Sequence, residues 1–200
     1  QPSRTEGNRR FYSDTDLKKI LNINTLYNHG IKISKIAQMS EEEIVHQCKA
    51  IIFNKSEKDG MINEMIQHII KFDRYSIDKI LIEQLSEQDL EALYLQKILP
   101  MLQKMGELWQ VNTINVIHEH FFSYLFREQL VSAINKLQSP QKDAPRALLF
   151  LPDHEEHEFG LLMYYYFLKK RGYSCIYLGQ KVPFKEIINA YKTINPTLVI

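Results

Sequence analysis

A loop that can hold a metal ion lies in the last third of this 200-residue chain, where Glu155 precedes His157 by two residues and Gly160 follows it by three. A neutral imidazole can give one ring nitrogen to a metal while a carboxylate holds the other nitrogen. Gly160 has no Cβ and would let the backbone approach a large ligand. Taken alone, an acidic loop with two histidines (His154 and His157) is more often a solvated surface loop, so both interpretations stay open.

A second group of residues that can do chemistry lies in the middle of the chain. Trp109 is the one tryptophan, and Glu119 and His120 follow it by ten and eleven residues. Adjacent helical residues point about 100° apart, so only one of Glu119 and His120 can lie squarely on an apolar helix face. Taken singly, Trp109 is equally consistent with a core anchor and His120 with a buried, hydrogen-bonded histidine.

A third group can bind phosphate. Arg4, Arg9 and Arg10 flank Glu6-Gly7-Asn8, whose Gly and Asn tolerate positive φ, so a hairpin is predicted here. Planar guanidinium groups fit phosphate oxygens, although a solvated basic loop is the alternative. Residues 1–37 carry seven Lys/Arg and three Asp/Glu, whereas the other 163 residues balance at −3. We therefore expect only the N-terminal end to meet a polyanion.

Helical periodicity predicts the elements in the first two thirds of the chain, which would position the second and third groups. Ser13 to Asp16 begins a helix that Gly30 ends, and Ser34 begins another. Apolar residues then recur at helical spacing almost throughout residues 41–138, which predicts a four-helix bundle. The four helices are expected at about 61–72, 76–85, 86–105 and 113–137.

The pattern changes after the polar segment 139–145. Short apolar runs now alternate with helical segments, which predicts a partial, doubly wound parallel sheet of the α/β class. The expected order is a strand at 147–151, a helix at 158–171, a strand at 174–178, a helix at 184–193 and a strand at 197–200. The loop that carries Glu155 and His157 then lies at the carboxyl edge of the sheet, where such folds bind ligands.

Composition excludes several classes of protein. Hydrophobic residues make up 44% and charged residues 24% of the chain, which is typical of a folded globular protein. Two cysteines are too few for a disulfide framework or a cysteine-based zinc site. No apolar run approaches the length of a membrane span and no signal peptide opens the sequence, so a cytoplasmic protein is expected. The missing initial Met and the unfinished last strand lead us to expect a fragment cut at both ends.

Residues 3–40 resemble the wing and following helix of MerR-type winged-helix regulators, which carry Arg-Thr, then Arg-x-Tyr, then Asp-Leu at the spacing found here. The resemblance implies that this part is the remnant of a DNA-binding domain. In that family a helix-turn-helix precedes the wing, and this sequence starts after it. What remains would hold phosphates and contact few bases. The DNA-binding residues implied are Arg4, Thr5, Arg9, Arg10 and Tyr12.

The other two groups together resemble a cobalamin-binding module. Such modules combine a bundle carrying Trp-x9-Glu-His with a sheet opened by acid-x-His-x-x-Gly. The resemblance implies that His157 is the lower cobalt ligand, with Glu155 where the family usually has Asp and Gly160 closing the pattern. Gly179, followed by Pro183, resembles the second strand of the same module and is the last cofactor residue implied.

With both resemblances combined, the chain is similar to the light-sensing, adenosylcobalamin-dependent MerR regulators of the CarH/LitR type. This implies that Trp109 packs against the adenosyl group, that Glu119 hydrogen-bonds near it, and that His120 binds cobalt after light removes that group. A transcriptional repressor is expected, a homodimer or homotetramer on double-stranded DNA, with no catalytic residues and no membrane partner. The domains implied are a winged-helix remnant at 1–40, a bundle cap at 41–138 and an incomplete cofactor-binding sheet at 146–200.

Three departures from the family pattern keep alternatives open. Asn112 stands where the family has Gly, Glu155 replaces Asp, and Tyr164-Tyr-Tyr166 is bulky for the first sheet helix. One alternative is a MerR-type regulator that has lost the cofactor and uses the module for oligomerisation or partner binding. The other is a cobalamin-dependent methyltransferase subunit, which would have no use for a phosphate-binding hairpin.

Overall fold

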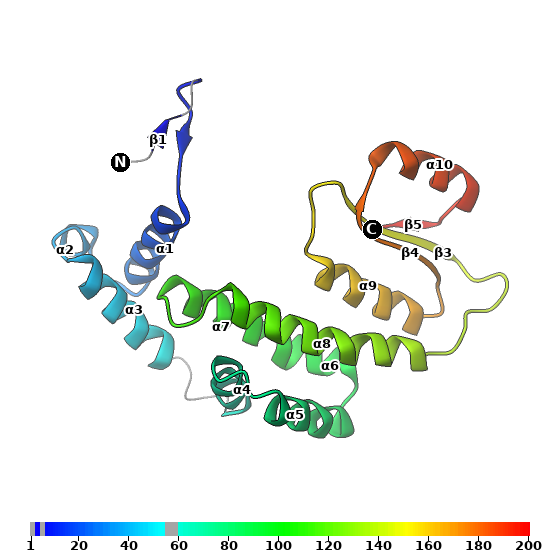
Figure 1. The fold of residues 1–200 in the computed structure, drawn as a ribbon, viewed down its shortest axis with the longest axis horizontal. Coiled ribbons are helices and arrows are strands. Elements are labelled where there is room, and N and C mark those ends of the chain that lie inside the picture. The colour runs from blue at the N-terminus through cyan, green and yellow to red at the C-terminus, as the bar shows by residue number, and fades with distance from the viewer. Residues whose placement is uncertain (1–2, 5–6, 55–59) are drawn as a thin grey trace. The chain divides into compact units, whose positions relative to one another are not determined.

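The structure is a computed structural model that describes residues 3–4, 7–54 and 60–200 (Figure 1). Its contacts form two compact units, which are described separately. Unit 1 comprises Gln1–Gln88 and Ala92–Phe121, and unit 2 comprises Asp89–Glu91 and Phe122–Ile200. The division into domains at 1–40, 41–138 and 146–200 stays a prediction. In the part of the chain that the structure describes, no helix has the length and hydropathy of a membrane span.

Unit 1 opens with the predicted hairpin. Strand β1 (Ser3–Arg4) pairs antiparallel with β2 (Arg10–Phe11). Helix α1 (Asp14–Asn28) follows, and Ser13 and Asp16 cap it reciprocally: Ser13 Oγ accepts from the Asp16 amide at 3.2 Å and Asp16 Oδ2 accepts from the Ser13 amide at 2.9 Å. The backbone hydrogen bond from Ser13 lowers the pKa of Asp16. Short α2 (Ile33–Ile36) and α3 (Glu41–Asn54) complete the N-terminal part.

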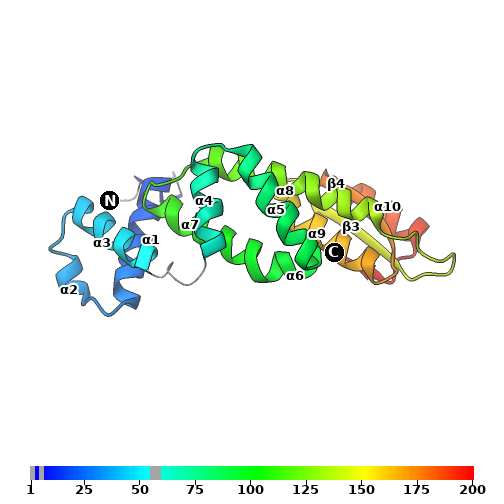
Figure 2. The same cartoon turned by 90° about the horizontal axis from the view of Figure 1, so that it is seen from below.

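The helical region predicted for the middle of the chain is confirmed. It consists of α4 (Gly60–Ile70), α5 (Arg74–Glu87), α6 (Leu90–Leu93), the π-helical η2 (Tyr94–Ile98), α7 (Leu99–Gln110) and α8 (Val116–Lys136). The π turn precedes Pro100, whose missing N–H removes one helical hydrogen bond and so favours a locally wider turn. Within unit 1, α4 lies against α5 and α7 (Figures 1 and 2).

Unit 2 contains the predicted doubly wound parallel sheet. Strands β3 (Arg146–Pro152), β4 (Ser174–Val182) and β5 (Leu198–Val199) lie in the order β4-β3-β5, and both pairings are parallel. Helices α9 (Glu158–Lys170) and α10 (Phe184–Ile194) cover opposite faces of the sheet (Figure 1). The central strand is therefore buried on both sides, which is why it is continuously apolar at Ala147, Leu148 and Leu149.

The bulky tyrosines of α9 are accommodated by packing inside unit 2. Tyr166 is 5% exposed, and Tyr165 stacks on Tyr177 of β4 with ring centroids 5.1 Å apart. Only Tyr164 of the three is largely exposed, at 52%. Tyr165 and Tyr166 thus help to pack α9 within unit 2.

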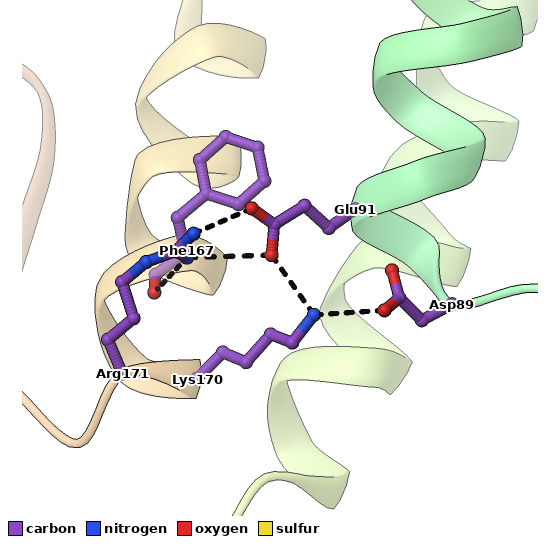
Figure 3. Close-up of polar contacts among 5 residues, drawn as sticks. All are labelled: Asp89, Glu91, Phe167, Lys170 and Arg171. Carbon is purple, nitrogen blue, oxygen red and sulfur yellow. Dashed lines mark hydrogen bonds and ion pairs between the residues drawn. The ribbon is translucent and has the colours of Figure 1, made fainter.

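An ion-pair cluster holds the segment 89–91 to the C-terminal end of α9 (Figure 3). Lys170 Nζ donates to Asp89 Oδ2 at 3.1 Å and to Glu91 Oε2 at 3.0 Å. Arg171 Nη2 donates to Glu91 Oε1 at 2.7 Å, and its Nη1 also reaches the Phe167 carbonyl oxygen at 3.0 Å. The Glu91 side chain is 21% exposed and that of Lys170 33%, whereas those of Asp89 and Arg171 are more than half exposed, so Glu91 is the best-shielded member of the cluster.

Replacement of Glu91 by Gln should lower the free energy of unfolding by about 1 kcal/mol at neutral pH, because Arg171 and Lys170 lose their shared carboxylate. Hydrogen bonds from Arg171 and then Lys170 lower the pKa of Glu91, so its contribution is present above the ordinary carboxyl pKa and lost as pH falls through the lowered one. Urea unfolding followed by circular dichroism should show the difference shrinking in acid. Glu64→Gln, at an exposed position of α4, is the control, and equal effects of the two variants at neutral pH would contradict the prediction.

Candidate functional site

The loop between β3 and α9 presents an imidazole with one nitrogen already held. Glu155 Oε1 lies 2.5 Å from His157 Nδ1 and accepts the His157 backbone N–H at 2.7 Å. The backbone bond, followed by the side-chain bond, lowers the pKa of Glu155, which favours its ionised form. The His157 side chain is 94% exposed, so Nε2 is accessible. This is the carboxylate–imidazole arrangement that orients a histidine toward a metal.

In the described part of the chain, His157 and its neighbours do not form a multidentate metal site. Among the described residues, no group of three or more His, Cys, Asp and Glu side chains could hold a metal ion alone. His157 is the N-cap of α9, and Gly160 lies in its first turn. A Cβ at Gly160 would meet no protein atom within 4 Å, so packing inside the chain does not require glycine there. Gly160 is exposed, and its assignment to the cofactor stays a prediction.

Neighbouring contacts fix the conformation of this loop. Glu156 pairs with Lys181 Nζ at 2.5 Å, and its carbonyl oxygen accepts from Gln180 Nε2 at 2.9 Å. Glu158 accepts from the Tyr177 hydroxyl at 2.9 Å and from Arg127 Nε at 3.2 Å. Burial and then the bond to Glu158 raise the pKa of Tyr177, which keeps this hydroxyl a donor. The residues on both sides of His157 are therefore anchored while its imidazole is exposed.

Gly179 has a backbone role in β4. Its φ of +80° coincides with an irregularity in the pairing of β3 with β4, where Gly179 lies opposite Phe150. Left-handed backbone at a bulge favours glycine. Its assignment to the cofactor stays a prediction.

In unit 1, Trp109 lies in the last turn of α7, and Asn112 ends that helix. The Asn112 amide bonds the Trp109 carbonyl oxygen at 3.1 Å and the Thr113 amide bonds that of Leu108 at 2.9 Å, with Asn112 at φ +55°. This is a Schellman ending, in which the left-handed residue is usually Gly and sometimes Asn. The departure from the family glycine therefore preserves the backbone conformation.

Trp109 and Asn112 share a partner from α1 that sequence reasoning missed. The Lys18 ammonium lies 4.3 Å from the centroid of the Trp109 ring and donates to Asn112 Oδ1 at 2.7 Å. Asn22, one turn further along α1, donates from Nδ2 to the Gln110 carbonyl oxygen at 3.3 Å. The only sequence signal was a pair of lysines in a helix, which is equally typical of a solvated face.

At the start of α8, Glu119 Oε2 lies 3.1 Å from His120 Nδ1, and the His120 side chain is 61% exposed. Neither side chain joins the buried core. The preceding His118 stacks on Phe72, with centroids 4.8 Å apart, and its Nδ1 accepts the Asn115 amide at 3.1 Å. His120 thus resembles His157 in having Nδ1 next to a carboxylate.

The basic hairpin is solvent-exposed where the structure describes it. Arg9, Arg10 and Tyr12 are exposed, and the backbone of Arg4 pairs with that of Arg10. Thr5 lies outside the described residues, and so does the side chain of Arg4. The structure therefore brings two of the three predicted arginines to one exposed ribbon.

Two family models match this chain. Residues 1–43 match the MerR HTH family regulatory protein, and residues 61–134 match the B12 binding domain. Among curated relatives, the chain is 25% identical over 204 residues to the HTH-type transcriptional repressor CarH of Myxococcus xanthus, covering 99% of this chain and 68% of that protein. It is 28% identical over 202 residues to the repressor CarA of the same organism, covering 100% and 65%.

The chain thus spans about two thirds of the length of these two relatives. Among solved structures, it is similar to the methanol:cobalamin methyltransferase complex MtaBC from Methanosarcina barkeri. That similarity has a TM-score of 0.38 and 15% sequence identity, and covers 96% of this chain and 69% of the other.

The Schellman ending of α7 gives a prediction for Asn112. Asn112→Ala should lower the free energy of unfolding by about 1 kcal/mol, because alanine tolerates the left-handed conformation poorly. Asn112→Gly should melt at a higher temperature than Asn112→Ala, because both variants lose the hydrogen bond from Lys18 and only glycine adopts the left-handed conformation freely. If alanine and glycine gave the same melting temperature, the left-handed backbone would not be the reason for asparagine here.

Proposed function

We propose that this protein is a DNA-binding transcriptional regulator controlled by cobalamin. Residues 1–43 match the MerR family model and residues 61–134 match the B12 binding domain. The full-chain relatives CarH and CarA are named transcriptional repressors, so repression is the mode of control we propose. The observation that carries the cofactor part is the Glu155–His157 pair, which leaves an accessible imidazole nitrogen. No catalytic residue is needed for this function.

The residues present fit a cobalamin. His157 is proposed as the residue that would hold cobalt through Nε2, with Glu155 orienting the ring. Gly160 would leave space beside this ligand. Trp109, Glu119 and His120 of unit 1 are proposed as further cofactor-binding residues, consistent with the partial exposure of Trp109 and Glu119 and with the exposed position of His120.

The adenosyl form of the cofactor is part of this proposal. When bound, adenosylcobalamin supplies a cobalt–carbon bond that light can cleave. Glu119 next to Nδ1 of His120 keeps that imidazole oriented with Nε2 available, as a second cobalt ligand requires. A cofactor that brings most of its own metal ligands needs a single histidine from the protein and no multidentate site. The Glu155–His157 and Glu119–His120 pairs each provide one such histidine.

DNA contact is proposed through the exposed hairpin. Arg9 and Arg10 would pair with phosphates, which gives salt-sensitive and largely sequence-independent affinity. Such weak contacts become useful when several copies are linked, so we propose that a homodimer or homotetramer presents more than one hairpin to DNA. Cobalamin would then act by favouring one arrangement of the protein over another.

His157→Ala should abolish the tight retention of hydroxocobalamin, and Glu155→Gln should weaken it by about 10- to 100-fold because the imidazole loses its orienting carboxylate. Equilibrium dialysis with detection of the visible corrin band measures both. His154→Ala is the matched control, since His154 is an exposed histidine of the same loop. Equal affinities of the His157→Ala and His154→Ala proteins would exclude His157 as the ligand.

Arg10→Ala should weaken binding to duplex DNA and reduce the slope of log K against log salt by about 1, because one phosphate contact is lost. Fluorescence anisotropy with a labelled duplex over a range of salt concentrations measures both quantities. Lys142→Ala, an exposed basic position in the loop before β3, is the control. An unchanged slope in the Arg10→Ala protein would show that the hairpin does not contact phosphate.

A further inference from the structure

Lys18 connects two parts of unit 1 that match different families. It lies in α1, within the MerR match, while Trp109 and Asn112 lie within the B12 binding domain match. Its ammonium contacts both, 4.3 Å from the Trp109 ring centroid and 2.7 Å from Asn112 Oδ1. One charged side chain therefore joins the helix after the hairpin to the tryptophan proposed for the cofactor.

The mechanical connection to the hairpin is short. Strand β2 ends at Phe11 and α1 begins at Asp14, so only two residues separate them. Ser13 caps α1 reciprocally with Asp16, which fixes how the chain enters the helix. A shift of α1 would thus move the base of the arginine-bearing hairpin.

The surroundings of Lys18 leave room for a second arrangement. A cavity of about 230 Å³ lies at the junction of α1, α3 and α7. Lys18, Asn22, Trp109 and Asn112 all line it. A side chain in a filled core could not move without displacing neighbours, whereas here the ammonium and the indole adjoin open space.

Asn22, which lines the same cavity, carries a second acceptor for the ammonium. Asn22 is 3% exposed, and its Oδ1 has no hydrogen-bond partner among the described residues. Lys18 and Asn22 are four residues apart on α1 and therefore neighbours on one helix face. A buried amide oxygen without a donor costs free energy, and a Lys18 ammonium that left Trp109 would supply that donor.

We propose that Lys18 is a positioning residue that couples the cofactor site to the DNA-binding hairpin, holding Trp109 when no cofactor contacts it and moving to Asn22 when one does. This inference rests on the proposed function of Trp109. A ligand that stacks on the indole face occupied by the ammonium must displace it, so the cation and the cofactor compete for one ring. By linkage, any change in the Lys18 contact changes cofactor affinity.

The coupling predicts the effect of three variants. Lys18→Met removes the competing cation and should tighten binding of adenosylcobalamin about two- to fivefold, the effect of one partly exposed cation–π contact. Lys18→Arg keeps a cation and a donor and should behave like the wild type. Lys19→Met is the matched control, because the neighbouring Lys19 pairs with Glu41 at 2.5 Å instead of with Trp109.

Two measurements on the 200-residue chain test this. Equilibrium dialysis in the dark with adenosylcobalamin gives the affinities. Acrylamide quenching of the apo proteins reports the environment of Trp109 alone, since the chain has one tryptophan. We expect faster quenching in the Lys18→Met protein than in the wild type, Lys18→Arg and Lys19→Met proteins, together with the tighter binding.

The outcomes separate the inference from the function on which it rests. If the wild type binds adenosylcobalamin but Lys18→Met matches Lys19→Met in affinity, the coupling is wrong and the proposed function stands. If the wild type retains no corrinoid, the proposed function fails and the coupling fails with it. Tighter binding in both lysine variants would point to general loss of charge and would also overturn the role of Lys18.

Discussion

The carboxylate of Glu155 decides which nitrogen of His157 is presented to solvent. With Nδ1 held at 2.5 Å and the backbone amide held at 2.7 Å by the same oxygen, the ring offers Nε2. The rest of unit 2 supports this small arrangement: β3 delivers the loop to the sheet edge, and α9 begins immediately after His157. The buried faces of the sheet give the loop a rigid base.

Unit 1 is constrained by the way α7 ends. Asn112 adopts the left-handed conformation that a Schellman ending requires, and its side chain gains a contact that glycine would lack. That contact draws Lys18 over Trp109 and so ties α1 to the end of α7. Asn112 in place of glycine thereby keeps the backbone conformation and adds a hydrogen bond between the segments matched by the two families.

Local patterns predicted the regular elements well, whereas contacts between distant segments were out of reach. The cap at Ser13 and the apolar run at 147–151 place α1 and β3 within a residue of the structure. The π turn before Pro100 and the extension of β4 to Val182 through Gly179 were missed, because proline and glycine in a sequence are equally typical of the end of an element. The Lys18–Trp109 contact joins residues 91 positions apart, and single-sequence periodicity carries no information on such pairs.

We propose above all that this chain holds an adenosylcobalamin through His157. The most direct measurement mixes the protein with adenosylcobalamin in the dark, removes unbound cofactor by desalting, and records the visible spectrum before and after green light. The account predicts a corrin band that stays with the protein and changes on illumination. A colourless protein after desalting would contradict it and would favour a MerR-type regulator that has kept the fold without the cofactor.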